Sequence, residues 1–368
     1  MKVLHSWQSV LWITCLAILS SLSQTHALAN TAPKSNPFKD LLFKGSAAVD
    51  PATSSPPSLA MSLNAQQFLT DLQLTSDIEP EQFKSSPQNI PNLLTASVPA
   101  VLRAASGVFG LDYKIEIVPK DDSKYTYLSI GNYQLKESCS PLLKQPQQPL
   151  ILYEFESCPF CRIVREACSI LSLTVTFRPV PKGGRKFRPE IKNKYGKSAT
   201  FPFLIDPNTS VSMFESTDII KYLFATYGGR RDDNIPRILQ PSLATTLTAG
   251  LGVGLARLGA GGAHKDSNPN LVKRPLVVWG YEGSPFCKIV REALCEKELE
   301  HTVIFTPRGS PNRQTLWELT KSIAPSAPFF QVPLLQDPNT GVCLFESEAI
   351  VEYIDKVYGI EQSPVEFL

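Results

Sequence analysis

The sequence lacks a dominant charge and has little cysteine. Its 36 lysine and arginine residues nearly balance 34 aspartate and glutamate residues over 368 positions. This balance provides no global field that would draw the chain onto nucleic acid or an acidic membrane. Eight cysteines are too few for a disulfide scaffold in a chain of this length. With 43% hydrophobic residues, we expect globular domains held by apolar cores, and no nucleic-acid partner.

Ligands for a metal ion are also sparse. The chain has a single Cys-x-x-Cys pair, Cys158 and Cys161, and only four histidines. Zinc ligation would need two further ligands, and neither a second Cys-x-x-Cys pair nor paired histidines supply them. We therefore expect no metal site. Redox chemistry is the favoured interpretation of this pair, and an inactive remnant, a structural disulfide and a metal site are the alternatives.

No long hydrophobic run is present, but the N-terminus has a short one. Lys2 and His5 precede an apolar stretch from Val10 to Leu22, and Ala27-Leu28-Ala29 follows as a small-x-small cleavage pattern. These features predict a secretory signal peptide over residues 1–29, with a retained signal anchor as the alternative. Residues 30–92 form a predicted disordered or transit-like linker, rich in serine, proline and alanine.

The remaining chain contains an internal sequence repeat. Three blocks recur in the same order and at nearly the same spacing: Cys158–Ala167 as Ser284–Ala293, Pro202–Thr209 as Pro333–Thr340, and Phe214–Ser216 as Phe345–Ser347. A repeat of this kind indicates two copies of one folding unit. The copies differ at one decisive atom, because the sulfur of Cys158 becomes the hydroxyl oxygen of Ser284.

Each copy shows the order β-α-β-α-β-β-α in its apolar periodicity and its turn signals. The predicted fold class is α/β, with two tandem thioredoxin-like domains and a small α+β N-terminal cap. The predicted domains are the cap at 93–145, domain 1 at 148–230, a glycine-rich linker helix at 231–274, and domain 2 at 275–362. The cap is expected to contain a helix over 98–109 and strands over 114–118 and 125–130. The linker helix is interrupted by Pro241 and carries Arg257, so we expect no membrane span in the mature chain.

The chemistry of the copies lies where the first strand enters the first helix. Cys158 is placed at a helix N-terminus, where unpaired N–H groups and the helix dipole favour a thiolate. Cys161 lies one turn further on and would close a disulfide after Cys158 has attacked a substrate. In the second copy Ser284 and Cys287 form a degenerate site, and burial is the commoner fate of such a lone cysteine.

Two further positions recur in both copies. Pro202 and Pro333 each open a strand, and a cis peptide bond is favoured there over an ordinary trans proline. Glu215-Ser216 and Glu346-Ser347 begin the last helix of each copy. They are either simple helix caps or, as their recurrence favours, a site for a carboxylate.

Together these motifs resemble the thioredoxin-fold domain of glutaredoxins and of the N-terminal half of glutathione S-transferases. The stretch from Leu344 to Ile350 is very similar to the transferase version. The arrangement also resembles tandem two-domain proteins of plants and algae, which are usually plastid-targeted. The resemblance covers about 150–229 and 275–359. A transferase normally continues into an all-helical domain, and the sequence leaves no length for one.

The resemblance implies a role for each matched residue. Cys158 would be the nucleophile and Cys161 the resolving cysteine, while Ser284 stands where serine-type transferases stabilise the glutathione thiolate. The residues implied in glutathione binding are Phe201, Pro202, Glu215, Ser216, Val332, Pro333, Glu346 and Ser347. Glutathione would act as co-substrate, and protein or small-molecule disulfides would be the other partners.

The favoured hypothesis is a glutathione-dependent thiol–disulfide oxidoreductase whose second domain binds glutathione or peptide. The alternatives are a non-enzymatic thioredoxin-fold adaptor and a transferase-like conjugating enzyme. For localisation, a signal peptide followed by a transit-like segment favours a plastid, with a secreted or lumenal protein as the second choice.

Overall fold

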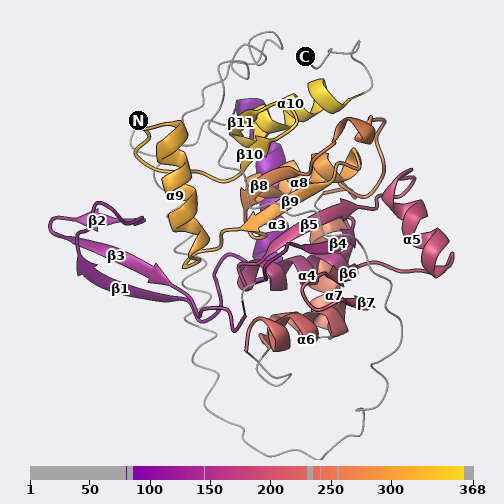
Figure 1. The fold of residues 1–368 in the computed structure, drawn as a ribbon, viewed down its shortest axis with the longest axis horizontal. Helices are drawn as coiled ribbons and strands as arrows, with labels where there is room; N and C mark the ends of the chain where they lie inside the picture. The colour runs from indigo at the N-terminus through magenta and orange to yellow at the C-terminus, as the bar shows by residue number, and fades with distance from the viewer. Residues whose placement is uncertain are drawn as a thin grey trace, which may run out of the picture. The chain divides into compact units, whose positions relative to one another are not determined.

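Each copy of the repeat forms the predicted β-α-β-α-β-β-α order (Figure 1). Copy one comprises β4 (Leu150–Glu154), α4 (Pro159–Ile170), β5 (Thr174–Pro179), α5 (Phe187–Tyr195), β6 (Phe203–Asp206), β7 (Val211–Phe214) and α6 (Ser216–Thr226). Copy two comprises β8 (Leu276–Gly280), α8 (Pro285–Glu296), β9 (His301–Phe305), α9 (Asn312–Ile323), β10 (Leu334–Asp337), β11 (Val342–Phe345) and α10 (Ser347–Tyr358). Both copies therefore have the thioredoxin fold.

The computed structural model describes residue 80 and residues 86–144, 146–229, 235–240, 242–254 and 257–359. The predicted signal peptide and most of the predicted linker lie outside these residues. Residues 86–92 of that linker form a short 3₁₀ turn, η1 (Pro87–Asn89), and the first residues of a helix. Within the described ranges, no helix combines the length and the apolarity needed to cross a bilayer.

One eight-stranded sheet joins the two copies, in the order β11-β10-β8-β9-β5-β4-β6-β7. Within each copy the first two strands pair in parallel, β4 with β5 and β8 with β9. The seam between the copies is the antiparallel pair β5–β9, where Thr174 lies opposite Ile304 and Phe177 opposite His301. Pairing at the seam covers one edge of each four-stranded half, and unprotected edges are a liability for a sheet.

The two faces of the sheet are packed differently. On one face a single apolar core runs through both copies and includes Val164 of α4, Val290 of α8, Leu223 of α6 and Ile354 of α10. On the other face each copy has its own small cluster, one around Ile191 of α5 and the other under α9. The shared core and the seam make the two copies one packed body.

The recurring Asp-Pro-Asn-Thr turns have a structural role. Oδ1 of Asp206 accepts the N–H of Asn208 at 2.8 Å, and Oδ2 accepts the hydroxyl of Tyr222 at 2.6 Å. Asp337 does the same in copy two, with Asn339 at 2.7 Å and Tyr353 at 2.7 Å. A buried carboxylate thus ties each β-hairpin turn to the last helix of its copy.

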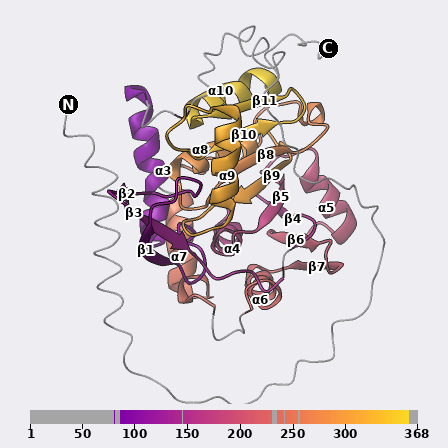
Figure 2. The same cartoon turned by 60° about the vertical axis from the view of Figure 1, so that its left-hand side comes forward.

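The structure extends the internal repeat to a pair of helices that the sequence analysis did not recognise as equivalent. These are α3 (Ile90–Leu102), before copy one, and α7 (Leu243–Gly254), before copy two. The two helices pack against each other, and each also packs on the other copy, α3 on α8 and α7 on α4 (Figure 2). The helix before copy one therefore covers copy two, and the helix before copy two covers copy one.

The cap at 93–145 differs from its sequence-based description. Its helix ends at Leu102 rather than Phe109, because Ala104, Ala105 and Gly107 all adopt positive φ. Its strands are β1 (Lys114–Pro119), β2 (Ser129–Ile130) and β3 (Tyr133–Ser138), in the order β1-β3-β2. The predicted second strand over 125–130 is wrong in length and place, because the tight turn falls at Gly131, with φ 59°, and the long partner of β1 follows it.

Candidate functional site

Cys158 sits at the N-cap of α4, directly after the loop that follows β4. Its backbone is extended (φ −81°, ψ 122°), and Pro159 occupies the first helical position, where no hydrogen bond is lost. The backbone N–H of Cys161 donates to Sγ of Cys158 at 3.2 Å. The sulfur of Cys158 therefore receives the hydrogen bond that a capping oxygen would receive.

The pKa values of the two sulfurs of this pair are shifted in opposite directions. Hydrogen bonding from Cys161 lowers the pKa of the Cys158 thiol, against the effect of burial. Burial and the hydrogen bond to Cys158 raise the pKa of the Cys161 thiol well above its usual range. Cys158 is 4% exposed and Cys161 is fully buried. The arrangement favours a thiolate at Cys158 and a protonated thiol at Cys161.

A cis peptide bond lies beside the pair in each copy. The Phe201–Pro202 and Val332–Pro333 bonds are both cis, which confirms the prediction. The carbonyl oxygen of Phe201 is 3.9 Å from Sγ of Cys158. The guanidinium of Arg188 stacks over the Phe201 ring at 5.0 Å and donates from Nε to the carbonyl of Pro181 at 2.8 Å. The loop containing Pro202 thus forms one wall of the Cys158 site.

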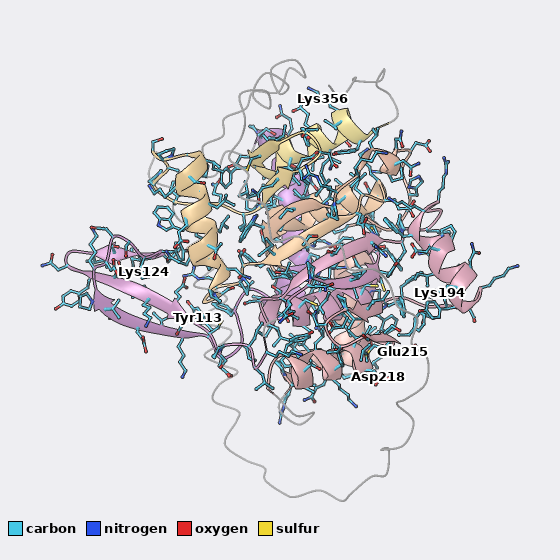
Figure 3. The ribbon with its side chains drawn as sticks, in the orientation of Figure 1. Tyr113, Lys124, Lys194, Glu215, Asp218 and Lys356 are labelled. Carbon is cyan, nitrogen blue, oxygen red and sulfur yellow. The ribbon has the colours of Figure 1, made fainter. Side chains whose placement is uncertain are left out.

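The Glu-Ser motif begins α6 and α10 as predicted, with an unusual backbone. Glu215 has φ 69° and Glu346 has φ 66°, in a region that non-glycine residues seldom adopt. Neither side chain caps its own helix. Glu215 is exposed whereas Ser216 is buried, and Figure 3 shows Glu215 and Asp218 at the start of α6. The same strained geometry in both copies marks these helix starts as candidate sites.

The second copy repeats the scaffold with Ser284 in the place of Cys158. Oγ of Ser284 accepts the N–H of Cys287 at 3.3 Å, as the sulfur of Cys158 does in copy one. Cys287 is 1% exposed, and burial raises the pKa of its thiol. Ser284 and Cys287 thus occupy the positions expected of them, and the sulfur of Cys287 lies in the core. Cys168, Cys295 and Cys343 are buried too.

In each copy the segment that follows the covering helix lies against the loop before the first helix of the copy. A β-carbon at Gly283, next to Ser284, would overlap Cγ2 of Val108, in the segment after α3. At the matching place in copy one, a β-carbon on Gly262 would overlap Oγ of Ser157. The contact is therefore made by a side chain of the covering segment, Val108, in copy two, and by a side chain of the loop itself, Ser157, in copy one.

The β1–β3 sheet adds a second cover to copy two. Arg308, in the loop after β9, donates to Glu137 of β3 at 2.5 Å, and its guanidinium stacks over Tyr127 at 4.0 Å. Residues 307–310 of this loop are buried, whereas Lys182, Gly183 and Arg185 of the matching loop in copy one are exposed. This loop is therefore more exposed in copy one than in copy two, although Cys158 and Ser284 themselves are 4% and 3% exposed.

A buried cluster of charges connects the two sites, and sequence reasoning missed it. Nε of Arg165 lies 3.1 Å from Glu282, and Nη2 lies 3.1 Å from Glu156. Arg291 makes the matching contacts, 3.2 Å to Glu156 and 3.1 Å to Glu282. Arg165 also pairs with Glu154 at the end of β4. The signal was present, because Glu156 and Arg165 recur as Glu282 and Arg291.

These geometries define the class of the protein: two thioredoxin-fold domains in one chain, with a cysteine-capped helix in the first and a serine-capped helix in the second. The model of the glutathione S-transferase N-terminal domain matches the chain twice, over residues 152–231 and 278–363. The chain therefore carries two tandem domains of the glutathione S-transferase N-terminal type.

Other comparisons add little. No curated protein matches the chain. Among solved structures, the chain is similar to "Leishmania TDR1 - a unique trimeric glutathione transferase", with 17% sequence identity, a TM-score of 0.19, and coverage of 60% of this chain and 69% of that chain. Among the described residues, no group of three or more histidine, cysteine, aspartate or glutamate side chains is placed to hold a metal ion.

Proposed function

We propose that copy one is a glutathione-dependent thiol–disulfide oxidoreductase. The observation that carries the proposal is the split of the Cys158–Cys161 pair into a sulfur with a lowered pKa at the helix N-cap and a buried sulfur with a raised pKa. A thiolate is the nucleophile in disulfide exchange, so Cys158 is the attacking group.

The reaction proceeds by successive thiol–disulfide exchanges. The Cys158 thiolate attacks a disulfide R–S–S–R′, forms a Cys158–S–S–R mixed disulfide and releases R′–S⁻, which takes a proton from water. A glutathione thiolate, or Cys161 after loss of its proton, then attacks the mixed disulfide and releases R–S⁻. The product is a Cys158–glutathione disulfide, or a Cys158–Cys161 disulfide that one glutathione thiolate opens to the same Cys158–glutathione disulfide. A second glutathione thiolate then attacks the glutathione sulfur and releases the Cys158 thiolate together with glutathione disulfide. Two glutathione molecules thus supply the two electrons in total.

The cis-proline loop and the Glu-Ser helix start would bind glutathione. Phe201, beside Pro202, offers its backbone to the cysteinyl part, next to the sulfur that it faces. Glu215 and Ser216, at the strained start of α6, would hold the γ-glutamyl end. Copy two keeps Val332, Pro333, Glu346 and Ser347 but has no attacking sulfur, so it acts as a binding module without redox activity.

A coupled assay of disulfide reduction by glutathione tests the proposal. Cys158→Ser should reduce the rate to the uncatalysed background, because a hydroxyl does not take part in disulfide exchange. Cys161→Ser should keep part of the activity, since glutathione also resolves the mixed disulfide. Cys287→Ser is the matched control and should behave as the parent. A Cys158→Ser protein that reduces disulfides as fast as the parent would refute the assignment.

Thiol trapping gives an independent measurement. In a glutathione redox buffer, mass spectrometry should find one glutathione adduct on the parent chain, at Cys158. A chain that forms no adduct, with a Cys158 pKa near the value of about 8.5 for a free cysteine, would favour the adaptor alternative.

We also propose that the N-terminal residues direct the chain into a plastid surrounded by extra membranes. The support is the order of the two segments, a signal-like run at 1–29 and an acid-poor segment after it. A fluorescent protein fused after residue 92 should reach the plastid. Secretion of the fusion would favour the second choice.

A further inference from the structure

Positive charge is concentrated at one place beside the Cys158 site, over residues 181–199, which we call the basic surface. It comprises the loop after β5, helix α5 and the turn that follows α5. Seven lysine and arginine residues lie in this stretch, against one acidic residue, Glu190. Because the whole chain is nearly neutral, the basic surface is a local excess of one charge.

The chain itself neutralises little of this charge. Within the described ranges, Arg185 is the one cation of the basic surface with an ion pair, to Asp266 at 3.3 Å, and both side chains of that pair are 72% exposed. The exposed cations Lys182 and Lys197 have no acidic partner among the described residues. Glu190 lies 3.9 Å from Arg178 of β5, outside the set. Since an exposed ion pair holds its members weakly, most of the charge is available to a partner.

The place of Lys182 in copy one is the place of Arg308 in copy two. Arg308 follows Lys182 by 126 positions, which is also the offset between the first helices of the two copies. The backbone N–H of Arg308 donates to the carbonyl of Val108 at 2.7 Å, and that of Lys182 donates to the carbonyl of Gly262 at 2.7 Å. Each cation thus begins the loop that meets the covering segment of its own copy.

In copy two this place is occupied by the β1–β3 sheet and the loop within it. Arg308 pairs with Glu137 of β3, whose side chain is 4% exposed, and stacks on Tyr127 at 4.0 Å. Nη2 of Arg313, at the start of α9, donates to the hydroxyl of Tyr125 at 3.0 Å. The cations of copy two are therefore covered by a carboxylate and by tyrosine rings from a separate segment of the chain.

Copy one receives no such segment from the part of the chain that the structure describes. After Val108 the chain forms β1, β2 and β3 before it enters copy one, whereas after Gly262 it reaches β8, at Leu276, without a strand in between (Figure 1). Lys182 is exposed, whereas Arg308 is 7% exposed. The same place is thus covered in the copy with the serine and exposed in the copy with the thiol pair.

The basic surface adjoins this thiol pair. The guanidinium of Arg188 lies over the ring of Phe201, and the carbonyl oxygen of Phe201 is 3.9 Å from Sγ of Cys158. Arg188 also interacts electrostatically with both thiols. Lys197 precedes Phe201 by four residues. A segment bound to the basic surface would therefore lie beside the sulfur of Cys158.

We propose that the basic surface binds an acidic segment of a partner protein and presents a disulfide of that partner to Cys158. The inference rests on the proposed function of copy one and names its substrate class. In copy two the chain's own β3 gives a carboxylate to Arg308; in copy one the partner gives carboxylates to Lys182 and its neighbours. Because the cover in copy two is a polypeptide, a protein is favoured over a nucleic acid. Opposite charge also raises the rate at which such a partner reaches the site.

Peptide binding to the Cys158→Ser chain tests the docking without the chemistry. The probes are two fluorescein-labelled peptides of equal length with one tyrosine each; one carries four glutamates, and the other carries four glutamines in their place. Fluorescence anisotropy should show at least about 10-fold tighter binding of the acidic peptide in about 50 mM NaCl, with most of the difference lost in about 300 mM NaCl. Lys182→Glu with Lys197→Glu should abolish the preference.

The control variant, Lys114→Glu with Lys144→Glu, makes the same change of charge elsewhere. Lys114 begins β1 and Lys144 precedes β4, whose other end leads to Cys158, and both are exposed, so this variant should keep the preference. Circular dichroism should match the parent in both double variants. Reduction of hydroxyethyl disulfide, an uncharged substrate, by the parent chain tests the proposed function separately.

The outcomes distinguish the two proposals. A chain that reduces hydroxyethyl disulfide but binds both peptides equally would overturn this inference alone. An equal loss of preference in the two double variants would overturn it too, because the charge would then act from anywhere on the molecule. So would a single-stranded DNA that displaces the acidic peptide at an equal or lower concentration, since the surface would then be a nucleic-acid site. A chain that prefers the acidic peptide but reduces no disulfide would contradict the presentation to Cys158 together with the proposed function.

Discussion

At the residue scale, the two copies differ in a buried carboxylate as well as in a sulfur. Glu154, the last residue of β4, is 3% exposed and acts electrostatically on both Cys158 and Cys161. The matching residue of β8 is Gly280, where a β-carbon would lie 2.7 Å from Sγ of Cys287. Burial raises the pKa of Glu154 to about 7, against the lowering effect of Arg165. Copy one therefore carries, near its thiol pair, a carboxylate with a raised pKa, and copy two has a glycine at the matching position.

Removal of this carboxylate should make Cys158 more acidic. The negative charge of Glu154 raises the pKa of the Cys158 thiol, so Glu154→Gln should lower that pKa. The rate of alkylation by iodoacetamide, measured against pH, should show its midpoint at a lower pH than in the parent. Glu318→Gln, on the exposed side of α9, is the control and should leave the midpoint in place. An unchanged or higher midpoint in Glu154→Gln would show that the carboxylate does not act on Cys158.

At the element scale, the seam between β5 and β9 decides how the copies join. Oγ1 of Thr176 lies 2.9 Å from Oγ1 of Thr302 across the seam. The ring of His301 stacks on Phe177 with 5.4 Å between centroids and 13° between planes. Nδ1 of His301 lies 2.9 Å from the carbonyl of Leu299, which fits a neutral ring donating from Nδ1. Burial lowers the pKa of His301 to about 4.

The seam should therefore weaken in acid. The unfolded chain binds a proton at His301 below pH about 6.5, whereas the folded chain binds it only near pH 4, so stability is lost as pH falls through this window. His301→Phe keeps an aromatic ring and removes the titration. Urea denaturation should show that, from pH 7 to pH 4, the unfolding free energy of the parent falls by about 3 kcal/mol relative to that of the variant. If the difference in unfolding free energy between parent and variant did not change with pH, the lowered pKa of His301 would be contradicted.

The sequence predicts those elements whose conformation is determined by a few specific residues within the element itself. The Cys-Pro-Phe-Cys turn and the cis prolines are specific in type and spacing, and the structure has each where it was expected. The repeat of α3 in α7 was missed, because the two helices have few residues in common and neither contains a charged side chain. The pairing of β5 with β9 was missed as well. Strand edges pair through backbone hydrogen bonds, which leave no specific residue pattern in the sequence.

At the scale of the whole molecule, the packing resembles that of a dimer within one chain. Oγ of Ser169 donates to the carbonyl of Gly107 at 2.6 Å, and Sγ of Cys295 donates to the carbonyl of Gly261 at 3.1 Å. The backbone N–H of Glu282 in turn donates to Ser169 at 3.2 Å. Each covering segment is thus bonded to a helix of one copy and lies against the loop of the other. The charge cluster around Arg165 also joins the copies, because Arg165 of copy one contacts Glu282 of copy two and Arg291 of copy two contacts Glu156 of copy one.

A substitution in that cluster should loosen both copies at once. Arg165 is fully buried between Glu154, Glu156 and Glu282, so Arg165→Met removes a cation that these carboxylates share and should cost about 3–5 kcal/mol of unfolding free energy. Hydrogen exchange read by mass spectrometry should show equal loss of protection in β4 and β8, because Glu282 belongs to copy two. The exposed Arg185–Asp266 pair provides the control, and Arg185→Met should cost at most about 1 kcal/mol. If protection fell in β4 and stayed at the parent level in β8, the copies would unfold separately and the cluster would not couple them.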